Sequence, residues 1–330
     1  MSLLIPTYND YEDAHGALDT EQVYREAYEK AKDEKDQHGA WRFPWSFEVV
    51  HGFFKQADDS TDDAKFNYAL EDFGRLKSWS QIEQDIKELN KNAKSNEVYK
   101  VIFLARHGQG YHNVIVNKYG LDQWHVKWKF LTTDGELTYA PDASLTDVGI
   151  AQAKENNEAW KREIKAGAPI PSKFYVSPMQ RSSQTLVLTW DDIKPKSKRP
   201  IVTPSIRETI GENLCDERST VTVIKERFGK YGFIIPEDMP ENDIDFKYDY
   251  RETMPEQTFR INGFLQSLFN EDVKSDNTID KELVEENTFI STTSHAGTIR
   301  CFIVALNHRH FTISTGGMIP VVVKATRRLD

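Results

Sequence analysis

The segment from Val98 to Ala105, with the sequence VYKVIFLA, is the feature that most restricts the fold of this chain. A near-continuous apolar run of this length is typical of a strand buried on both faces of a parallel sheet. Shorter runs predict further strands at 173–177, 201–203, 287–293 and 320–325, and helical patterns fall at 146–165, 177–190, 219–229, 255–269 and 296–307. Strands that alternate with helices predict an α/β fold, a three-layer α/β/α sandwich with a mostly parallel central sheet.

The first 97 residues differ from the rest in charge. They hold 21 Asp+Glu and 12 Lys+Arg, so they carry almost all of the net charge of −10. Helices are predicted at 20–37 and 78–93, and an Asp-rich solvated loop at 58–63. The aromatic stretch from Trp41 to Phe54 is expected to pack on a later part of the chain, because so much ring area is rarely left in water. We therefore expect an acidic N-terminal extension, residues 1–97, packed on a main domain, residues 98–330.

Composition excludes several classes of protein. The excess of 52 Asp+Glu over 42 Lys+Arg argues against a nucleic-acid partner. Cys215 and Cys301 are far apart, so neither a disulfide framework nor a paired metal spacing is predicted. The sequence shows neither a signal peptide nor an apolar run long enough to cross a membrane. These observations predict a cytoplasmic location and allow an additional nuclear one, and they leave the oligomeric state open.

Charged side chains follow the predicted strands at the edge where ligands bind in open parallel sheets. Arg106 and His107 come after the first strand, Arg181 lies one turn beyond the second, and His295 follows the fourth. Two guanidinium groups can hold phosphoryl oxygens in a bidentate manner. A neutral imidazole can attack phosphorus, while a second, protonated imidazole can stabilise the equatorial oxygens. The set predicts a site for phosphoryl transfer.

A leaving alkoxide also needs a proton donor. Glu208 and Glu212 follow the third predicted strand and are the candidates, since burial or a nearby phosphate raises the pKa of a carboxyl group. Asp216 and Arg218 lie a few residues further on and would either face the substrate or form a solvated loop pair. Cys215 is expected to be a buried, inert thiol.

The stretch Leu104-Ala105-Arg106-His107-Gly108, with Asn113 six residues past the histidine, resembles the RHG signature of the histidine phosphatase superfamily, which includes phosphoglycerate mutases and phosphatases. Four further segments agree with that family in order and spacing: Leu145-Thr146 with Gly149 and Gln152-Ala153, Ser177-Pro178-Met179-Gln180-Arg181 with Gln184-Thr185, Arg207-Glu208, and Ser294-His295 with Gly297. The resemblance covers about residues 98 to 325 and implies a phosphoglycerate mutase-like fold.

The resemblance also implies roles for individual residues. His107 would be the nucleophile that becomes phosphohistidine, Glu208 the proton donor and later the base, and His295 the third catalytic residue. The phosphate would be bound by Arg106, Arg181, Asn113 and Gly297. No metal or cofactor is implied, because the arginine and histidine charges take the place of Mg²⁺.

Residues 207–218 resemble a subgroup of fungal phosphomutase-like proteins, which carry R-E-x-x-G...C-D-x-R where mutases have R-E-x-x-Y-G-x-L-x-G. A mutase must retain a bisphosphorylated intermediate through extra basic contacts, yet the only Arg-Arg pair is Arg327-Arg328 at the C-terminus. The sequence thus predicts a metal-independent phosphatase for a small phosphorylated metabolite, acting through phosphohistidine. A phosphoglycerate-type phosphomutase and a catalytically silent binding or scaffold member of the family are the alternatives.

Overall fold

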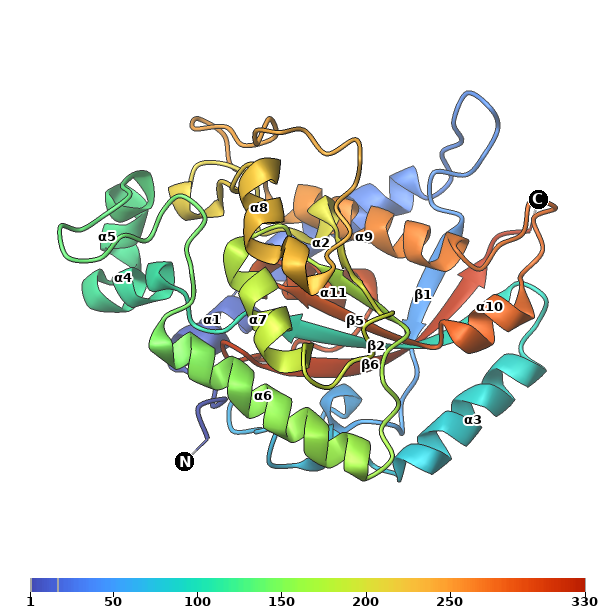
Figure 1. Cartoon of the computed structure of the whole chain (residues 1–330). Coiled ribbons are helices and arrows are strands. Elements are labelled where there is room, and N and C mark those ends of the chain that lie inside the picture. The colour runs from blue at the N-terminus through green and yellow to red at the C-terminus, as the bar shows by residue number, and fades with distance from the viewer. Residues whose placement is uncertain (1, 17, 330) are drawn as a thin grey trace.

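One six-stranded sheet forms the centre of the molecule, with strand order β1-β6-β2-β5-β3-β4 (Figure 1). The computed structural model describes residues 2–16 and 18–329. The strands are β1 (Trp45–Val49), β2 (Glu97–Arg106), β3 (Lys173–Val176), β4 (Pro200–Val202), β5 (Phe289–Ser294) and β6 (Met318–Arg327). Strands β2, β5, β3 and β4 are parallel, whereas β6 is antiparallel to both its neighbours, β1 and β2. The predicted α/β fold with a mostly parallel sheet is confirmed.

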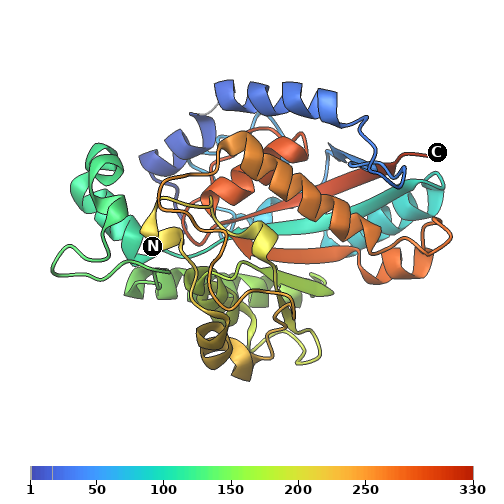
Figure 2. The ribbon, with the colours of Figure 1, turned by 90° about the horizontal axis from the view of Figure 1, so that it is seen from above.

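Helices cover both faces of this sheet. Helices α9 and α11 pack together on one face with α2 laid over α9, while α6 and α7 cover the other face (Figure 2). The helices are α1 (Tyr8–His15), α2 (Leu18–Ala31), α3 (Trp79–Asn92), α4 (Tyr111–Tyr119), α5 (Leu121–Val126), α6 (Asp147–Lys165), α7 (Gln180–Trp190), α8 (Val221–Phe228), α9 (Met254–Asn270), α10 (Lys281–Glu286) and α11 (Ala296–Ala305). Among the described residues, none of these helices has the length and apolar character needed to cross a membrane.

The aromatic stretch of the N-terminal third packs on the rest of the chain, as predicted. Its central part forms β1, which pairs with β6 along the sheet edge. The rings of Trp45 and Phe47 lie 5.7 and 5.4 Å from the ring of Phe269 in α9. Residues on both sides of position 97 belong to one hydrophobic core. The division into an extension, 1–97, and a main domain, 98–330, stays a prediction.

Two predicted helix boundaries are wrong. Helix α2 ends at Ala31 rather than near residue 37, and Gly39, with φ of +82°, lies in a separate turn that Asp36 closes by donating to the carbonyl of Ala40. Helix α7 begins at Gln180, so Ser177 does not cap it as predicted. The serine hydroxyl has another partner in the site described below.

The Asp-rich loop is only partly solvated. Asp58, Asp59 and Asp62 are exposed as predicted, but Asp63 is buried. The carboxylate of Asp63 accepts hydrogen bonds from the backbone and hydroxyl of Thr312 at 2.6 and 2.7 Å. Because these donors lie 249 positions away, a local pattern of acidic residues does not reveal them.

Candidate active site

The sheet register brings the predicted residues to one level. Arg106 at the end of β2 pairs with Ser294 at the end of β5, and Val176 at the end of β3 pairs with Thr293. His107 extends the ladder by donating its N–H to the carbonyl of Ser294 at 3.0 Å. The residues that follow three strands therefore meet at the carboxyl edge of the sheet, the usual ligand position in open α/β sheets.

His107 is held in one tautomer. Its Nδ1 lies 2.6 Å from the carbonyl oxygen of Gly108. A carbonyl oxygen only accepts, so Nδ1 carries the proton and Nε2 keeps its lone pair. His107 is 2% exposed, and burial, followed by the charges of Arg181 and Arg106, lowers its pKa well below the ordinary value. At neutral pH the imidazole is therefore neutral, the form a nucleophile requires.

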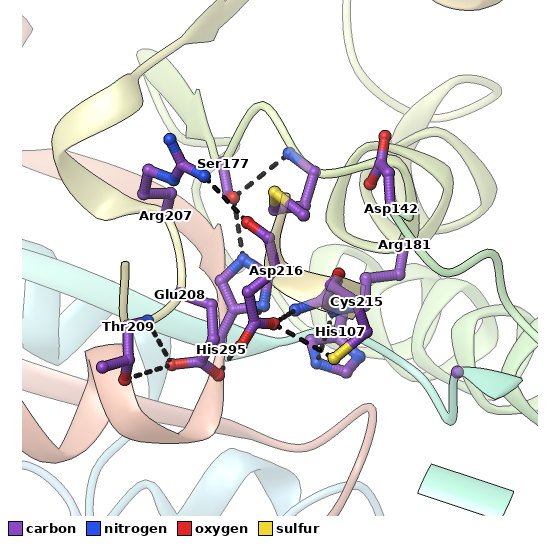
Figure 3. Close-up of polar contacts among 12 residues, drawn as sticks. His107, Asp142, Ser177, Arg181, Arg207, Glu208, Thr209, Cys215, Asp216 and His295 are labelled. Atoms are coloured by element: carbon purple, nitrogen blue, oxygen red, sulfur yellow. Dashed lines mark hydrogen bonds and ion pairs between the residues drawn. The ribbon is translucent and has the colours of Figure 1, made fainter. Parts of the chain in front are cut away.

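Arg181 is fully buried and faces the lone pair of His107. Its Nε lies 3.3 Å from Nε2 of the histidine. The other two nitrogens are fixed, since Nη1 donates to the carbonyl of Cys215 at 2.9 Å and Nη2 to the carboxylate of Asp216 at 2.8 Å (Figure 3). Arg251 approaches the second carboxylate oxygen of Asp216 at 3.3 Å. Asp216 thus orients the guanidinium group that faces the nucleophile.

The sequence left Asp216 and Arg218 as either substrate-facing residues or a loop pair, and the structure separates them. Asp216 is buried in the site, whereas Arg218 donates to the backbone carbonyl oxygens of residues 219 and 240–242 and so holds that loop. Cys215 is buried as predicted, and burial raises the pKa of its thiol well above the ordinary value. A thiol in this state is a poor nucleophile.

His295 lies next to His107, with the two ring centroids 5.0 Å apart. Its Nε2 is 2.7 Å from the hydroxyl oxygen of Ser177, and its Nδ1 is 3.9 Å from Oε2 of Glu208 (Figure 3). Burial, followed by the charge of Arg181, lowers the pKa of His295 well below the ordinary value. The sequence predicted a protonated imidazole here, but a buried position among arginines favours the neutral form.

Glu208, rather than Glu212, is the carboxylate beside His295. Burial, followed by the negative charge of Asp216, raises the pKa of Glu208. Glu212 forms an ion pair with Lys129 at 2.6 Å. A carboxyl group with a raised pKa keeps its proton closer to neutral pH, which suits a proton donor.

Gly297 makes room for this carboxyl group. A Cβ atom at Gly297 would lie 2.7 Å from Oε1 of Glu208 and 3.3 Å from the hydroxyl of Thr209, closer than real Cβ atoms normally come. The sequence predicted Gly297 as a phosphate-binding residue. In the structure, its nearest side chain is the predicted acid.

His112 and Asn113 lie at the start of α4, and the sequence predicted a role in the site for Asn113 alone. The side-chain oxygen of Asn113 accepts from the N–H of Gly110 at 2.9 Å, so it caps the helix, and among the described residues it makes no hydrogen bond to a pocket side chain. The ring of His112 lies 5.5 Å from that of His107, and its Nδ1 is buried without a partner in the described chain. His112 directly precedes Asn113 in the sequence, and this position next to a predicted site residue is the signal that could have identified it.

Arg106 directly precedes His107 in the sequence, and its partner was not predicted. Its Nη1 is 2.5 Å from a carboxylate oxygen of Asp10, a residue of the N-terminal helix α1. No local pattern around Asp10 points to this contact.

Comparisons with known proteins found a matching family and related proteins. The model of the histidine phosphatase superfamily (branch 1) matches residues 102–314. A probable phosphoglycerate mutase of Arthroderma benhamiae is 33% identical over 304 residues, which are 86% of this chain and 86% of that protein. A probable phosphoglycerate mutase of Saccharomyces cerevisiae is 28% identical over 302 residues, 84% of this chain and 96% of that protein. Among solved structures, phosphoglycerate mutase from Bacillus anthracis aligns at 14% identity with a TM-score of 0.42, over 70% of this chain and 90% of that chain.

The family match contains every element of the site except α1. It includes the Arg106-His107 pair, Arg181, Glu208 and His295, which the sheet brings together at one edge. These residue types in this arrangement, with the match to the family, support a phosphoryl-transfer enzyme. The chain belongs to the histidine phosphatase superfamily.

Proposed function

We propose that the protein is a metal-independent phosphatase that hydrolyses small phosphomonoesters through a phosphohistidine on His107. One observation carries the proposal: the hydrogen bond from Nδ1 of His107 to the carbonyl of Gly108 leaves the Nε2 lone pair facing Arg181. A neutral imidazole with a fixed tautomer, next to a buried cation, is prepared to attack a phosphoryl group.

In the first step, Nε2 of His107 attacks phosphorus and the P–O bond to the alcohol breaks. The electron pair of that bond stays on the leaving oxygen, which takes a proton from Glu208, whose pKa is raised. Nδ1 of His295 has no hydrogen-bond partner among the described residues, so a neutral imidazole bonded through Nε2 to Ser177 can donate its Nδ1 proton to a phosphoryl oxygen.

In the second step, water attacks phosphorus and the P–N bond to His107 breaks. The carboxylate of Glu208 takes the proton from water, and inorganic phosphate leaves. Together, the two steps return the enzyme to its starting state, because in the second step Glu208 regains the proton that it lost and His107 regains its lone pair. The substrate in this proposal is a small phosphorylated metabolite, and residues 1–97 form an extension around the catalytic domain.

A phosphoglycerate-type mutase is the second candidate, because the two fungal relatives are named probable phosphoglycerate mutases. A mutase holds a second phosphate with free cations near the site. Lys129 is paired with Glu212, and Arg251 with Asp216. Arg106 and Arg181 are paired in the same way, so this pairing does not distinguish hydrolysis from mutase activity.

The test is release of phosphate from p-nitrophenyl phosphate by the wild-type chain and by His107→Ala. The variant should lose at least about 10³-fold in kcat, because the nucleophile is gone. His125→Ala removes an exposed histidine of α5 and should keep wild-type kcat. Wild-type turnover in His107→Ala would disprove the proposal.

Product analysis separates the two candidates. With a phosphoglycerate as substrate, a phosphatase releases inorganic phosphate without any primer. A mutase instead requires a bisphosphate primer and yields an isomer. Isomer as the main product would replace the proposal with the second candidate.

A further inference from the structure

The N-terminal helix α1 docks beside the active site and contacts Arg106. It packs on α11, the helix that begins directly after His295. Asp13 of α1 pairs with Arg300 of α11 at 3.2 Å. From this position, Asp10 reaches Arg106 at 2.5 Å, and both residues are only 8% exposed.

Both carboxylate oxygens of Asp10 have defined partners. Oδ2 accepts from the N–H and the hydroxyl of Thr7 at 2.8 and 2.7 Å, which closes the capping box at the start of α1. Oδ1 accepts from Nη1 of Arg106. Burial alone would raise the pKa of Asp10, but the Arg106 charge and the Thr7 donors outweigh it and hold the pKa below its ordinary value. Asp10 is therefore ionised at neutral pH.

The nitrogens of Arg106 differ in how far their hydrogen-bond donors are used. Nη1 has two hydrogens, and both are used, one by Asp10 and one by the carbonyl of Ile313 at 2.6 Å. Nε is buried and has no partner among the described residues. Since Nη1 is saturated, a bidentate ligand can use only the edge formed by Nε and Nη2.

We propose that Asp10 is a positioning residue, which holds Nη1 of Arg106 so that the Nε edge of the guanidinium group binds the phosphoryl oxygens of the substrate. The inference rests on the proposed function, because it assumes that Arg106 binds a phosphoryl group. It makes α1, which lies outside the matched family region, a part of the active site.

Inorganic phosphate is the probe for this role, measured by calorimetry on the full chain and as a competitive inhibitor of p-nitrophenyl phosphate hydrolysis. Asp10→Asn keeps the size of the side chain but cannot offer a carboxylate to both partners. The phosphate Kd and the KM should rise about tenfold, while kcat changes less than about threefold. Glu12→Gln alters an exposed carboxylate of the same helix and should leave both constants unchanged.

A double-mutant cycle with Arg106→Ala separates positioning from a general effect on the fold. If Asp10 acts through Arg106, Asp10→Asn should change phosphate affinity less than about twofold in the Arg106→Ala background. A tenfold loss that persists there would overturn the proposal. An unchanged or tighter Kd in Asp10→Asn alone would overturn it too.

A failure of the proposed phosphatase function would give a different result from a failure of the role proposed for Asp10. In that case the wild-type chain shows no turnover dependent on His107, while calorimetry still reports whether Asp10 and Arg106 cooperate in binding phosphate. Thermal unfolding of each variant shows that weaker binding does not come from a smaller folded fraction.

Discussion

Strand β2 carries one buried ion pair near its start and another at its end, and the two pairs differ in whether every donor has a partner. Near its start, Lys100 lies 2.6 Å from the carboxylate of Asp272 and donates to the carbonyl of Asn287 at 2.8 Å. The Lys100 and Asp272 side chains are 1% and 0% exposed. At the other end, Arg106 also has a carboxylate partner, but its buried Nε has none in the described chain. Both ends of the strand bury an ion pair, so such a pair alone does not mark function, and what distinguishes Arg106 is the Nε–H left without a partner in the described chain next to His107.

The largest effect is expected from breaking the ion pair of Lys100 with Asp272 near the start of β2. Lys100→Met should lower the free energy of unfolding by about 3–5 kcal/mol, because Asp272 would keep an uncompensated buried charge. Denaturant unfolding measures this loss, and kcat of the remaining folded protein should stay at the wild-type value.

The matched double variant, Lys100→Met with Asp272→Asn, removes both charges and should recover most of the lost stability. A loss below about 1 kcal/mol in the single variant would contradict a structural role for the pair.

A smaller effect is expected in the active site, at the end of β2, from a substitution of Glu208. Glu208→Gln preserves the shape of the side chain but cannot transfer a proton. It should lower kcat/KM about 100-fold for alkyl phosphates but less than about threefold for p-nitrophenyl phosphate, because kcat/KM reports the first step, in which a nitrophenolate leaves without an acid. Glu212→Gln is the control and should remain near wild type. Equal losses on both substrates would point to another donor.

The pH profile sharpens this comparison. The pKa of Glu208 is raised, so the protonated acid persists above the ordinary range of glutamate and is lost as the pH rises through the raised value. The rate on alkyl phosphates should therefore fall on the basic side of the profile. In Glu208→Gln this dependence should disappear.

The smallest effect is expected from two glycine substitutions. Gly297→Ala places a methyl group 2.7 Å from the present position of Oε1 of Glu208 and should displace that carboxyl group, lowering kcat for alkyl phosphates about tenfold. Gly263 lies inside α9, with no atom within 4 Å of an added Cβ. Gly263→Ala should leave kcat unchanged and stabilise the fold by about 0.5–1 kcal/mol. Equal kcat values for the two variants would show that Gly297 does not position Glu208.

The sequence was sufficient to predict which residues meet at the carboxyl edge. Long apolar runs identify buried strands, and parallel strands end at one edge, so Arg106, His107, Arg181 and His295 had to lie together. The choice between Glu208 and Glu212 needed the structure, because both follow β4 within a few residues. In the structure, Glu208 lies beside His295, whereas Glu212 forms an ion pair with Lys129.

The partners of the site residues could not be predicted. Asp10 reaches Arg106 across 96 positions, and Asp216 reaches Arg181 across 35. Such contacts depend on how helices and loops pack, and no periodic pattern in the sequence encodes them. Ser177 illustrates the same limit, since its local sequence favoured a helix cap while its hydroxyl contacts His295.

The pairing of β1 with β6 has a consequence for the solubility of the chain. Val321 and Val323 of β6 are 2% and 0% exposed, with β1 along one side of the strand and β2 along the other. A chain shortened to residues 98–330 would leave the backbone donors and acceptors of β6 from Val323 to Arg327 open to a second molecule. Strand β1 closes that edge and presents a shorter one, with outward-facing Ser46 and Glu48. Strand β1 thus covers part of a sheet edge at which a second chain could otherwise pair.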